Sequence, residues 1–309
     1  MIDMVQKLLP LAGLLALIAA AFALASCASM ERQALRYVAA AQALPAPFLS
    51  DAVMPAPQGG GEWVASPAGL PGSVISREDI EALPPAAKRY FDYAGVEGTR
   101  RVASYSVILS GRIRNGPEAA WMPLTMRQYN RVDAPARVVY LESTKPPMAG
   151  VDSFVDGSGR MQIKVMNLIR VADSKGPEMD ASALVTFLND LVLCPSAYFS
   201  LPLRWRHMDD GRVELAFSHA GMSVRALLTA DDEGRLIDWS TEDRYADVKG
   251  ASLKDRWSTP FGQYGEQAGL RIPMQGAGIH DYDGQPYVYV ELDRITELTL
   301  NAEGLPKRP

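Results

Sequence analysis

The chain has 309 residues, of which 48% are hydrophobic and 22% charged, with a formal net charge of −5 at pH 7. This length and apolar content can bury the core of one large domain or two small ones. The mildly acidic balance argues against nucleic acid, and against anionic lipid headgroups, as main partners.

The amino-terminal segment has the three parts of an export signal. A short basic region carries Lys7, a hydrophobic stretch runs over residues 8–24, and small residues lead to a cysteine in Leu24-Ala25-Ser26-Cys27. This segment resembles a bacterial lipoprotein signal, in which the cysteine is acylated and becomes the first residue after cleavage. The resemblance implies a signal peptide over residues 1–26 and lipidation of Cys27, with acyl chains such as palmitate as the membrane anchor.

An uncleaved signal-anchor helix is the alternative, because residues 8–28 are about long enough to span a bilayer. Two or more acyl chains make a durable attachment, whereas one chain holds only marginally. In both alternatives the folded part of the chain is exported to the same side of the membrane. The residue after Cys27 is Ala28 rather than aspartate. By resemblance to lipoproteins of two-membrane bacteria, this favours the periplasmic face of the outer membrane over the inner membrane.

Residues 27–75 are predicted to connect the anchor to the folded body. Residues 31–44 are alanine-rich and predict a helix just outside the membrane, and residues 45–71 contain six prolines and Gly59-Gly60-Gly61. A segment of that composition acts as a tether, since it cannot form a core. The folded body is predicted to be a single β-rich domain over residues 76–309.

The body begins with two predicted helices. Ser76 and Asp79 have capping-box spacing, and Pro84-Pro85 stops the first helix and starts a second, which Gly95 ends. A third helix is predicted over residues 183–193. Most other apolar runs are short and separated by turn residues. They predict strands at residues 103–110, 121–129, 137–143, 151–155, 161–165, 203–208, 213–218, 224–229, 236–245, 287–292 and 295–300.

Many short strands at hairpin spacing, without alternation of strand and helix, predict an antiparallel sheet. From Leu83 onward the body resembles an uncharacterised domain-of-unknown-function family of bacterial envelope proteins. Short pieces in a fixed order carry the resemblance: Leu83-Pro84-Pro85, Arg89-Tyr90-Phe91, Trp121-Met122-Pro123 with Gln128, Gly150-Val151-Asp152, Asp156-Gly157-Ser158-Gly159 and Leu270-Arg271-Ile272-Pro273. The family implies no activity.

The architecture is also similar to periplasmic lipoprotein-carrier folds, which hold acyl chains in the hollow of a curved sheet. The predicted fold class is therefore α+β: a large curved antiparallel sheet, half-barrel-like, with a few helices packed on one face. Fold likeness alone does not define a function.

The sequence contains no recognisable catalytic motif. His207, His219 and His280 lack zinc-site spacing, and Ser158 falls in a predicted hairpin turn rather than at a nucleophile elbow. We therefore predict no catalytic residue, no metal and no cofactor. Besides Cys27 the chain has only Cys194, which lies in an apolar run that predicts a buried, inert thiol and no intramolecular disulfide.

Aromatic side chains in the predicted strands, together with 13 methionines, could line an adaptable apolar groove. They could equally fill the core, since aromatic residues favour half-buried strand surfaces. The candidate groove residues are Trp121, Gln128, Tyr140, Asp152, Trp205 and Arg271.

The favoured prediction is a lipid-anchored, exported envelope protein without catalytic activity that binds an apolar ligand or an acyl chain. It has the membrane as a partner through its acyl chains and has no nucleic-acid partner. A structural or interaction module of an envelope assembly is the alternative, suggested by the tether and the acidic, motif-free surface. A third hypothesis is a metal-assisted hydrolase that uses Asp152 or His280 with a bound ion.

Overall fold

A computed structural model describes residues 29–46, 62–166, 169–248, 251–282 and 284–308. Cys27 and the predicted leader lie outside these residues. Among the described residues, none of the helices is both long and apolar enough to span a bilayer.

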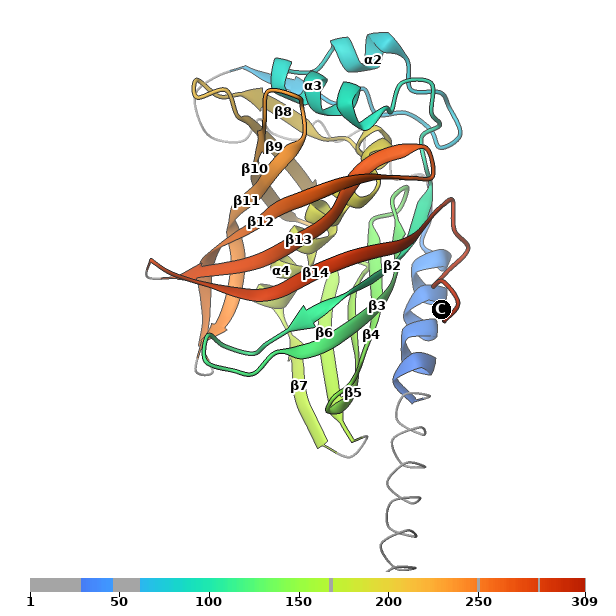
Figure 1. Ribbon diagram of the computed structural model, residues 1–309. Coiled ribbons are helices and arrows are strands. Elements are labelled where there is room, and N and C mark those ends of the chain that lie inside the picture. The colour runs from blue at the N-terminus through green and yellow to red at the C-terminus, as the bar shows by residue number, and fades with distance from the viewer. Residues whose placement is uncertain (1–28, 47–61, 167–168, 249–250, 283, 309) are drawn as a thin grey trace, which may run out of the picture.

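One continuous sheet of 14 strands makes up most of the molecule (Figure 1). Its strands are β1 (Trp63–Ala65), β2 (Ser104–Ile113), β3 (Met122–Arg131), β4 (Ala136–Thr144), β5 (Pro147–Val155), β6 (Ser158–Val165), β7 (Ile169–Lys175), β8 (Arg204–His207), β9 (Val213–His219), β10 (Met222–Ala230), β11 (Leu236–Val248), β12 (Ala251–Gln267), β13 (Leu270–Tyr282) and β14 (Gln285–Leu300). The helices are residues 29–43, α2 (Arg77–Glu81), α3 (Pro85–Ala94), α4 (Pro177–Asp190) and the 3₁₀ turns η1 (Leu191–Leu193) and η2 (Pro195–Ser200).

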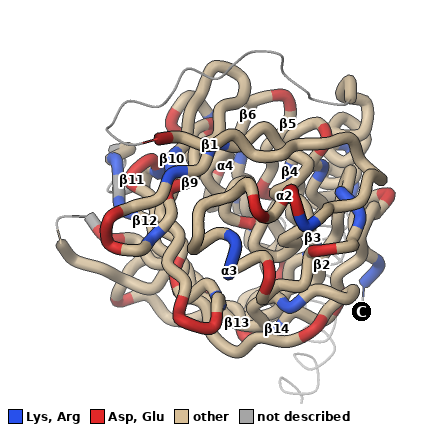
Figure 2. Tube along the Cα trace, turned by 90° about the horizontal axis from the view of Figure 1, so that it is seen from above, with Lys and Arg blue, Asp and Glu red and all other residues tan. Residues whose placement is uncertain are grey.

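The strand order is β1-β8-β9-β10-β11-β12-β13-β14-β2-β3-β4-β5-β6-β7, and every neighbouring pair is antiparallel. The last strand, β14, pairs with β2 and joins the two halves of the sheet. The sheet curves into a half-barrel around α4, which lies between β10 and β4 when viewed from the α2 and α3 end (Figure 2). The predicted large, curved antiparallel sheet is confirmed.

Helices cover both faces of this sheet, which differs from the predicted packing on one face. On the concave face, α4 packs its Phe187 in the same core as Phe154 of β5. On the convex face, residues 29–43 pack Val38 in a second core with Val138 of β4. The reason is that β4 is apolar on both sides, so each side needs a cover.

Local signals at the helices and turns behave as the sequence predicts. The Ser76 hydroxyl accepts a hydrogen bond from the Asp79 amide at 3.3 Å, and the Ser76 amide donates to the Asp79 carboxylate at 2.7 Å, which completes the capping box. Gly95 ends α3 in the left-handed region at φ 75°. Asp156 and Gly157 both have positive φ in the turn between β5 and β6.

The described part of the proline-rich segment is attached to the domain. β1 pairs with β8, and the Ser66 amide donates to the Leu203 carbonyl at 2.7 Å. The Arg101 guanidinium donates to the carbonyls of Pro67 and Val74 at 2.9 and 2.7 Å. The domain therefore includes residues 62–75, which the sequence assigns to the tether, because an arginine distant in sequence satisfies their carbonyls.

Four strands, β1, β7, β12 and β13, are not predicted from the sequence. The two runs predicted at 287–292 and 295–300 form the single strand β14, whose pairing with β2 shifts register between Leu292 and Arg294 and between Ile295 and Glu297. Such irregularities bend a strand and increase its twist. They lie beside the cavity described below, where the sheet is curved around α4.

Candidate ligand-binding site

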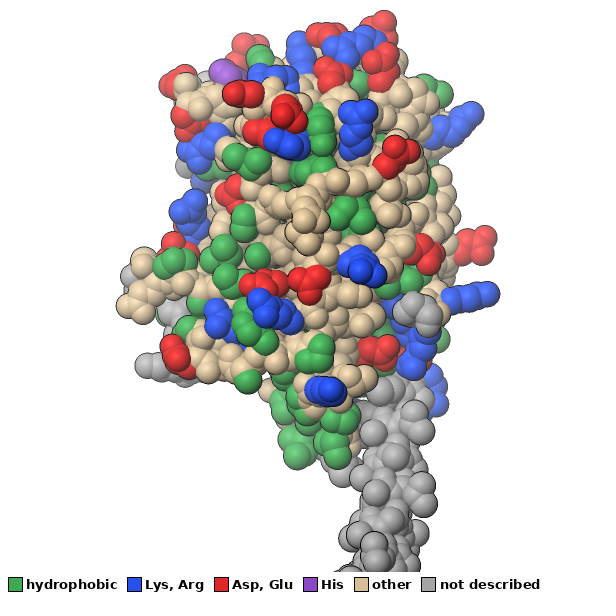
Figure 3. Space-filling view, viewed as in Figure 1, with side chains coloured by type: hydrophobic (Ala, Val, Ile, Leu, Met, Phe, Trp, Pro, Cys, Tyr) green, Lys and Arg blue, Asp and Glu red, His purple; other side chains and the backbone are tan. Residues whose placement is uncertain are grey.

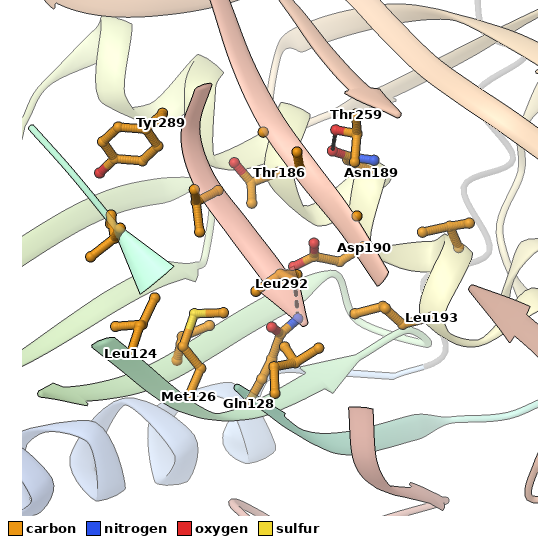
Figure 4. A pocket seen from close by; sticks show the side chains of 18 of the residues that line it. Leu124, Met126, Gln128, Thr186, Asn189, Asp190, Leu193, Thr259, Tyr289 and Leu292 are labelled. Atoms are coloured by element: carbon orange, nitrogen blue, oxygen red, sulfur yellow. Dashed lines mark hydrogen bonds between the residues drawn. The ribbon is translucent and has the colours of Figure 1, made fainter. Parts of the chain in front are cut away.

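A cavity of about 160 Å³ lies between the concave face of the sheet and the end of α4 (Figure 4). Its walls are mostly apolar. On β2, β3 and β4 they come from alternate residues, because every second side chain of a strand points to the same face. Other strand walls include those formed by β13 and by the irregular strand β14. The apolar lining includes Leu109, Ile113, Leu124, Met126, Val139, Leu141, Met161, Val192, Leu193, Phe261, Met274, Val290, Leu292 and Ile295.

A buried ion-pair cluster forms one polar part of this wall. Arg137 of β4 is 6% exposed and donates through Nε to Asp190 and through Nη1 to Asp152, both at 2.5 Å. Burial opposes the charge of Arg137, but the carboxylates of Asp190 and Asp152 raise its pKa above the usual value. Gln128 donates to the same Asp190 carboxylate at 2.7 Å (Figure 4). Arg137 is therefore held by two carboxylates and is a structural cation.

A second arginine of the cavity, Arg244 of β11, is paired differently. Its Nη1 donates to the Thr186 hydroxyl at 2.5 Å, and its guanidinium stacks over the Trp257 ring at 4.2 Å. Within the described residues, Arg244 forms no ion pair with a carboxylate, and its Nε has no hydrogen-bond partner. Burial lowers the pKa of Arg244. This guanidinium is a donor whose hydrogen-bonding capacity is only partly used.

Tyr289 of β14 lies in the same wall (Figure 4). Burial raises the pKa of Tyr289 to about 12, and the charge of Arg244 opposes that increase. At neutral pH the phenol is protonated and can donate a hydrogen bond. Arg244 and Tyr289 are thus two hydrogen-bond donors among the residues that line a mostly apolar space.

Hydrogen bonds fix the end of α4 relative to the sheet. Thr259 of β12 donates to the Asn189 side-chain oxygen at 2.8 Å (Figure 4). The Trp257 indole N–H lies within hydrogen-bond distance of both Asn189 and Thr259, at 3.2 and 3.0 Å. Because α4 is tied to β12 here and to β3 and β4 through Asp190, the cavity is held open between fixed walls.

The size of the cavity limits what it can hold. An engineered protein cavity of about 150 Å³ with apolar walls takes up benzene, so this one can take a segment of an aliphatic chain. Each methylene that leaves water for an apolar site contributes about 0.8 kcal/mol. Most of the wall therefore suits contact with an aliphatic chain, and a smaller number of polar side chains lie among the apolar ones.

The structure places two of the six predicted groove residues, Gln128 and Asp152, in the cavity wall. The other four lie elsewhere. Tyr140 is on the convex face, because it is one residue out of phase with the cavity residues Val139 and Leu141. Trp205 is completely buried in the core beside Phe91, Tyr198 and other rings at the α3 end of the half-barrel.

Trp121 and Arg271 lie outside the cavity for other reasons. Trp121 precedes β3 and is stacked by the guanidinium groups of Arg112 and Arg114, each 4.6 Å from its ring. Arg271 is exposed and donates to the Tyr93 carbonyl at 3.2 Å. Among the lining residues that sequence reasoning did not select are Arg244 and the β12 side chains, since neither periodicity nor a motif marks them.

The other sequence candidates have structural surroundings. Cys194 is buried, and burial raises the pKa of its thiol to about 12, as expected for an inert cysteine. His280 is packed among the rings of Trp257, Tyr287 and Tyr289. Asp152 pairs with Arg137. Within the described ranges, no three His, Cys, Asp or Glu side chains come together as a potential metal site.

The chain matches the family of unknown function DUF6544 over residues 73–292, more than half of its length. It therefore belongs to the DUF6544 family, and the predicted resemblance to a family of unknown function is confirmed. No protein with a curated description matches the chain in sequence.

Two solved structures are similar to the chain. A LolA superfamily protein from Nitrosomonas europaea has 11% identity and a TM-score of 0.37, over 76% of this chain and 96% of its own. A DUF1329 family protein from Desulfovibrio piger has 9% identity and a TM-score of 0.33, over 65% of this chain and 86% of its own. At these TM-scores neither similarity bears on function.

Proposed function

We propose that this protein is a non-catalytic binding protein that holds an acyl chain in the cavity between α4 and the concave face of the sheet. The observation that carries the proposal is the mostly apolar cavity of about 160 Å³, lined by alternate residues of β2, β3 and β4 and by residues of β14. A mostly apolar pocket with a few convergent polar groups is the usual form of a small-molecule site.

The polar groups of the cavity wall indicate which chemical group the acyl ligand carries at its polar end. Arg137 and Arg244 balance Asp152 and Asp190, so the four charges sum to zero. A free carboxylate in the ligand would add an uncompensated negative charge, which is costly in a buried site. An ester or amide carbonyl accepts from Arg244 and Tyr289 without adding charge. The proposed ligand is therefore an acyl ester or amide rather than a free fatty acid.

Blocking the cavity tests the binding function. Met126 of β3 points into the cavity (Figure 4) and is half-buried, so Met126→Trp fills the space from one side. We expect this variant to lose binding of a fluorescent monoacylglycerol analogue. Thr125→Trp is the matched control, because Thr125 is the adjacent residue, half-buried, and points to the opposite face. Equal binding by the two variants would contradict the proposal.

We further propose that the protein acts outside the cytoplasm, anchored through acyl chains on Cys27 at the periplasmic face of the outer membrane. The supports are the lipobox Leu24-Ala25-Ser26-Cys27 and the small residue that follows it. Metabolic labelling with radioactive palmitate tests the anchor: the full chain should incorporate label, and Cys27→Ala should not. Fractionation of the two membranes then tests the location.

A further inference from the structure

Exposed apolar side chains gather at one end of the half-barrel. Pro146 and Pro147 are exposed where β5 begins. Met166, which follows β6, and Ile169 and Val171 of β7 are 39%, 61% and 55% exposed. The Met166 amide donates to the Pro147 carbonyl at 3.0 Å, so these two hairpins lie side by side. We call these five residues the hairpin end. Figure 3 shows hydrophobic side chains gathered at the lower end of the molecule, where Figure 1 places β5 and β7.

The described chain also begins toward this end. Arg131 of β3 donates to the carbonyls of Ala41 and Leu44, whereas Arg127, nearer the start of β3, pairs with Glu31. Residues 29–43 therefore run with their first residue toward the hairpin end (Figure 1). Ser29 is two residues from Cys27, and a residue spans at most about 3.6 Å.

Apolar contacts connect the hairpin end to the cavity. Ile169 is opposite Val165 in the β6–β7 pairing, and Val165 is opposite Met148 in the β5–β6 pairing. Met148 and Val165 belong to the same apolar cluster as the cavity residues Leu141 and Met161. An acyl chain could move along this side of the sheet without leaving apolar surroundings.

Charged residues at this end suit a lipid surface. Lys145 is exposed between the two strands β4 and β5. Arg170 lies between Ile169 and Val171 with 59% of its side chain exposed, and it pairs with Asp173 at 2.9 Å, so Lys145 carries the local positive charge of this argument. A cation close to a negatively charged leaflet contributes about 1 kcal/mol. The chain as a whole has a net charge of −5, but the local charge decides how this end meets a membrane.

We propose that the hairpin end contacts a lipid bilayer and is the route by which an acyl chain reaches the cavity; the second part rests on the proposed binding function. Contiguous exposed apolar side chains mark interaction surfaces. A bilayer is the occupant because the described residues begin toward this end, two residues after the predicted anchor Cys27, and the apolar path leads inward from it.

A fluorophore at the hairpin end tests the contact. Ile169→Cys in the full chain, carrying an environment-sensitive dye, is reconstituted into vesicles of phosphatidylcholine and phosphatidylglycerol. We expect blue-shifted emission and loss of fluorescence when brominated lipids are included. Val74→Cys is the control, because Val74 is similarly exposed at 50% but lies beside α2 at the opposite end. The unsubstituted chain, treated with the dye in parallel, reports any signal from Cys27 and Cys194.

Equal signals at the two positions would overturn the membrane contact. A blue shift at residue 169 without quenching by brominated lipid would also overturn it, because that result indicates a second copy of the chain on β7. The double variant Ile169→Asp, Val171→Asp tests the route. We expect it to slow transfer of a monoacylglycerol probe from vesicles about tenfold, since two apolar contacts with the bilayer are lost. An unchanged transfer rate would contradict the route.

The two proposals fail in different ways. Met126→Trp should abolish binding of the probe but leave the fluorophore at residue 169 in contact with lipid. A different result is that brominated lipid quenches the fluorophore at residue 169 while the probe binds to the protein neither with nor without Met126→Trp. That result would support the membrane contact and contradict the binding function.

Discussion

The two faces of strands β3 and β4 differ in how completely other elements cover them. On the convex face, Tyr129 and Val138 are buried beneath residues 29–43 and the carboxyl-terminal residues. On the concave face, Met126 and Val139 face a cavity. The helix of residues 29–43 covers the convex face of these strands, whereas α4 packs on the concave face and leaves the cavity beside its end. The convex face shows that the same strands can be covered completely, so the space on the concave face is the feature on which the proposed binding function depends.

Replacing Arg137 on the concave face should cause the largest loss in the free energy of unfolding. Arg137→Met leaves the carboxylates of Asp152 and Asp190 buried without their partner. Breaking a buried pair in this way costs about 3–5 kcal/mol. Urea denaturation monitored by tryptophan fluorescence measures the free energy of unfolding. A loss smaller than about 1 kcal/mol, the scale of an exposed ion pair, would show that Arg137 is not the structural cation described here.

A charge placed beneath the helix of residues 29–43 should destabilise the packing of that helix on the convex face. Val38 is 5% exposed, so Val38→Asp buries a carboxylate in an apolar contact. We expect a loss of about 3 kcal/mol, or local release of residues 29–43. Hydrogen exchange of this helix measures the release. Ala39→Asp is the control on the exposed side of the same turn, and equal exchange in the two variants would contradict the closed convex face.

Arg244 should matter for binding more than for stability. Arg244→Met removes a donor that has no carboxylate partner among the described residues, so the loss in unfolding free energy should be smaller than for Arg137→Met. A charge-assisted hydrogen bond contributes about 1.5 kcal/mol or more, so affinity for an acyl ester should fall about tenfold. Calorimetric titration with a monoacylglycerol and with an alkane of the same length separates the contribution of the ester group to affinity from that of the aliphatic tail. An equal loss for both ligands would contradict the role of Arg244.

The smallest expected effect is the pH dependence of the helix on the convex face. Burial opposes the charge of Glu31, but Arg127 and Arg308 lower its pKa below 4.5. A depressed carboxyl pKa stabilises the folded state fully above the unfolded pKa and progressively less as pH falls through the folded one. Protection of residues 29–43 should therefore weaken below about pH 4.5. Glu31→Gln should remove that dependence, which hydrogen exchange at several pH values can test.

Sequence patterns predict the elements whose signals are local. The capping box at Ser76, the stop at Gly95 and the turn at Asp156 depend on residues a few positions apart. The strand β12 is not predicted, because Lys254, Pro260 and two glycines interrupt any alternation along it. Its conformation comes from pairing with β11 and β13 over most of its length, and such tertiary context overrides strand propensity.

The site is predicted only in part for a related reason. Alternation shows that Val139 and Tyr140 point to opposite faces, but it does not show which face encloses a cavity. Gln128 and Asp152 belong to the short pieces that carry the family resemblance, and both line the wall. Arg244 lies in a charged stretch of β11 that resembles an exposed strand. Its position beside the cavity depends on the curvature of the sheet around α4.

A crystal structure with a brominated ligand tests the central claim most directly. A monoacylglycerol with bromine on the last carbon of its chain marks the position of the tail by anomalous scattering. We predict one bromine peak among Leu124, Met126 and Val290, with the ester carbonyl near Arg244. A peak only on the outer surface, or a cavity that stays empty at saturating ligand, would contradict the account.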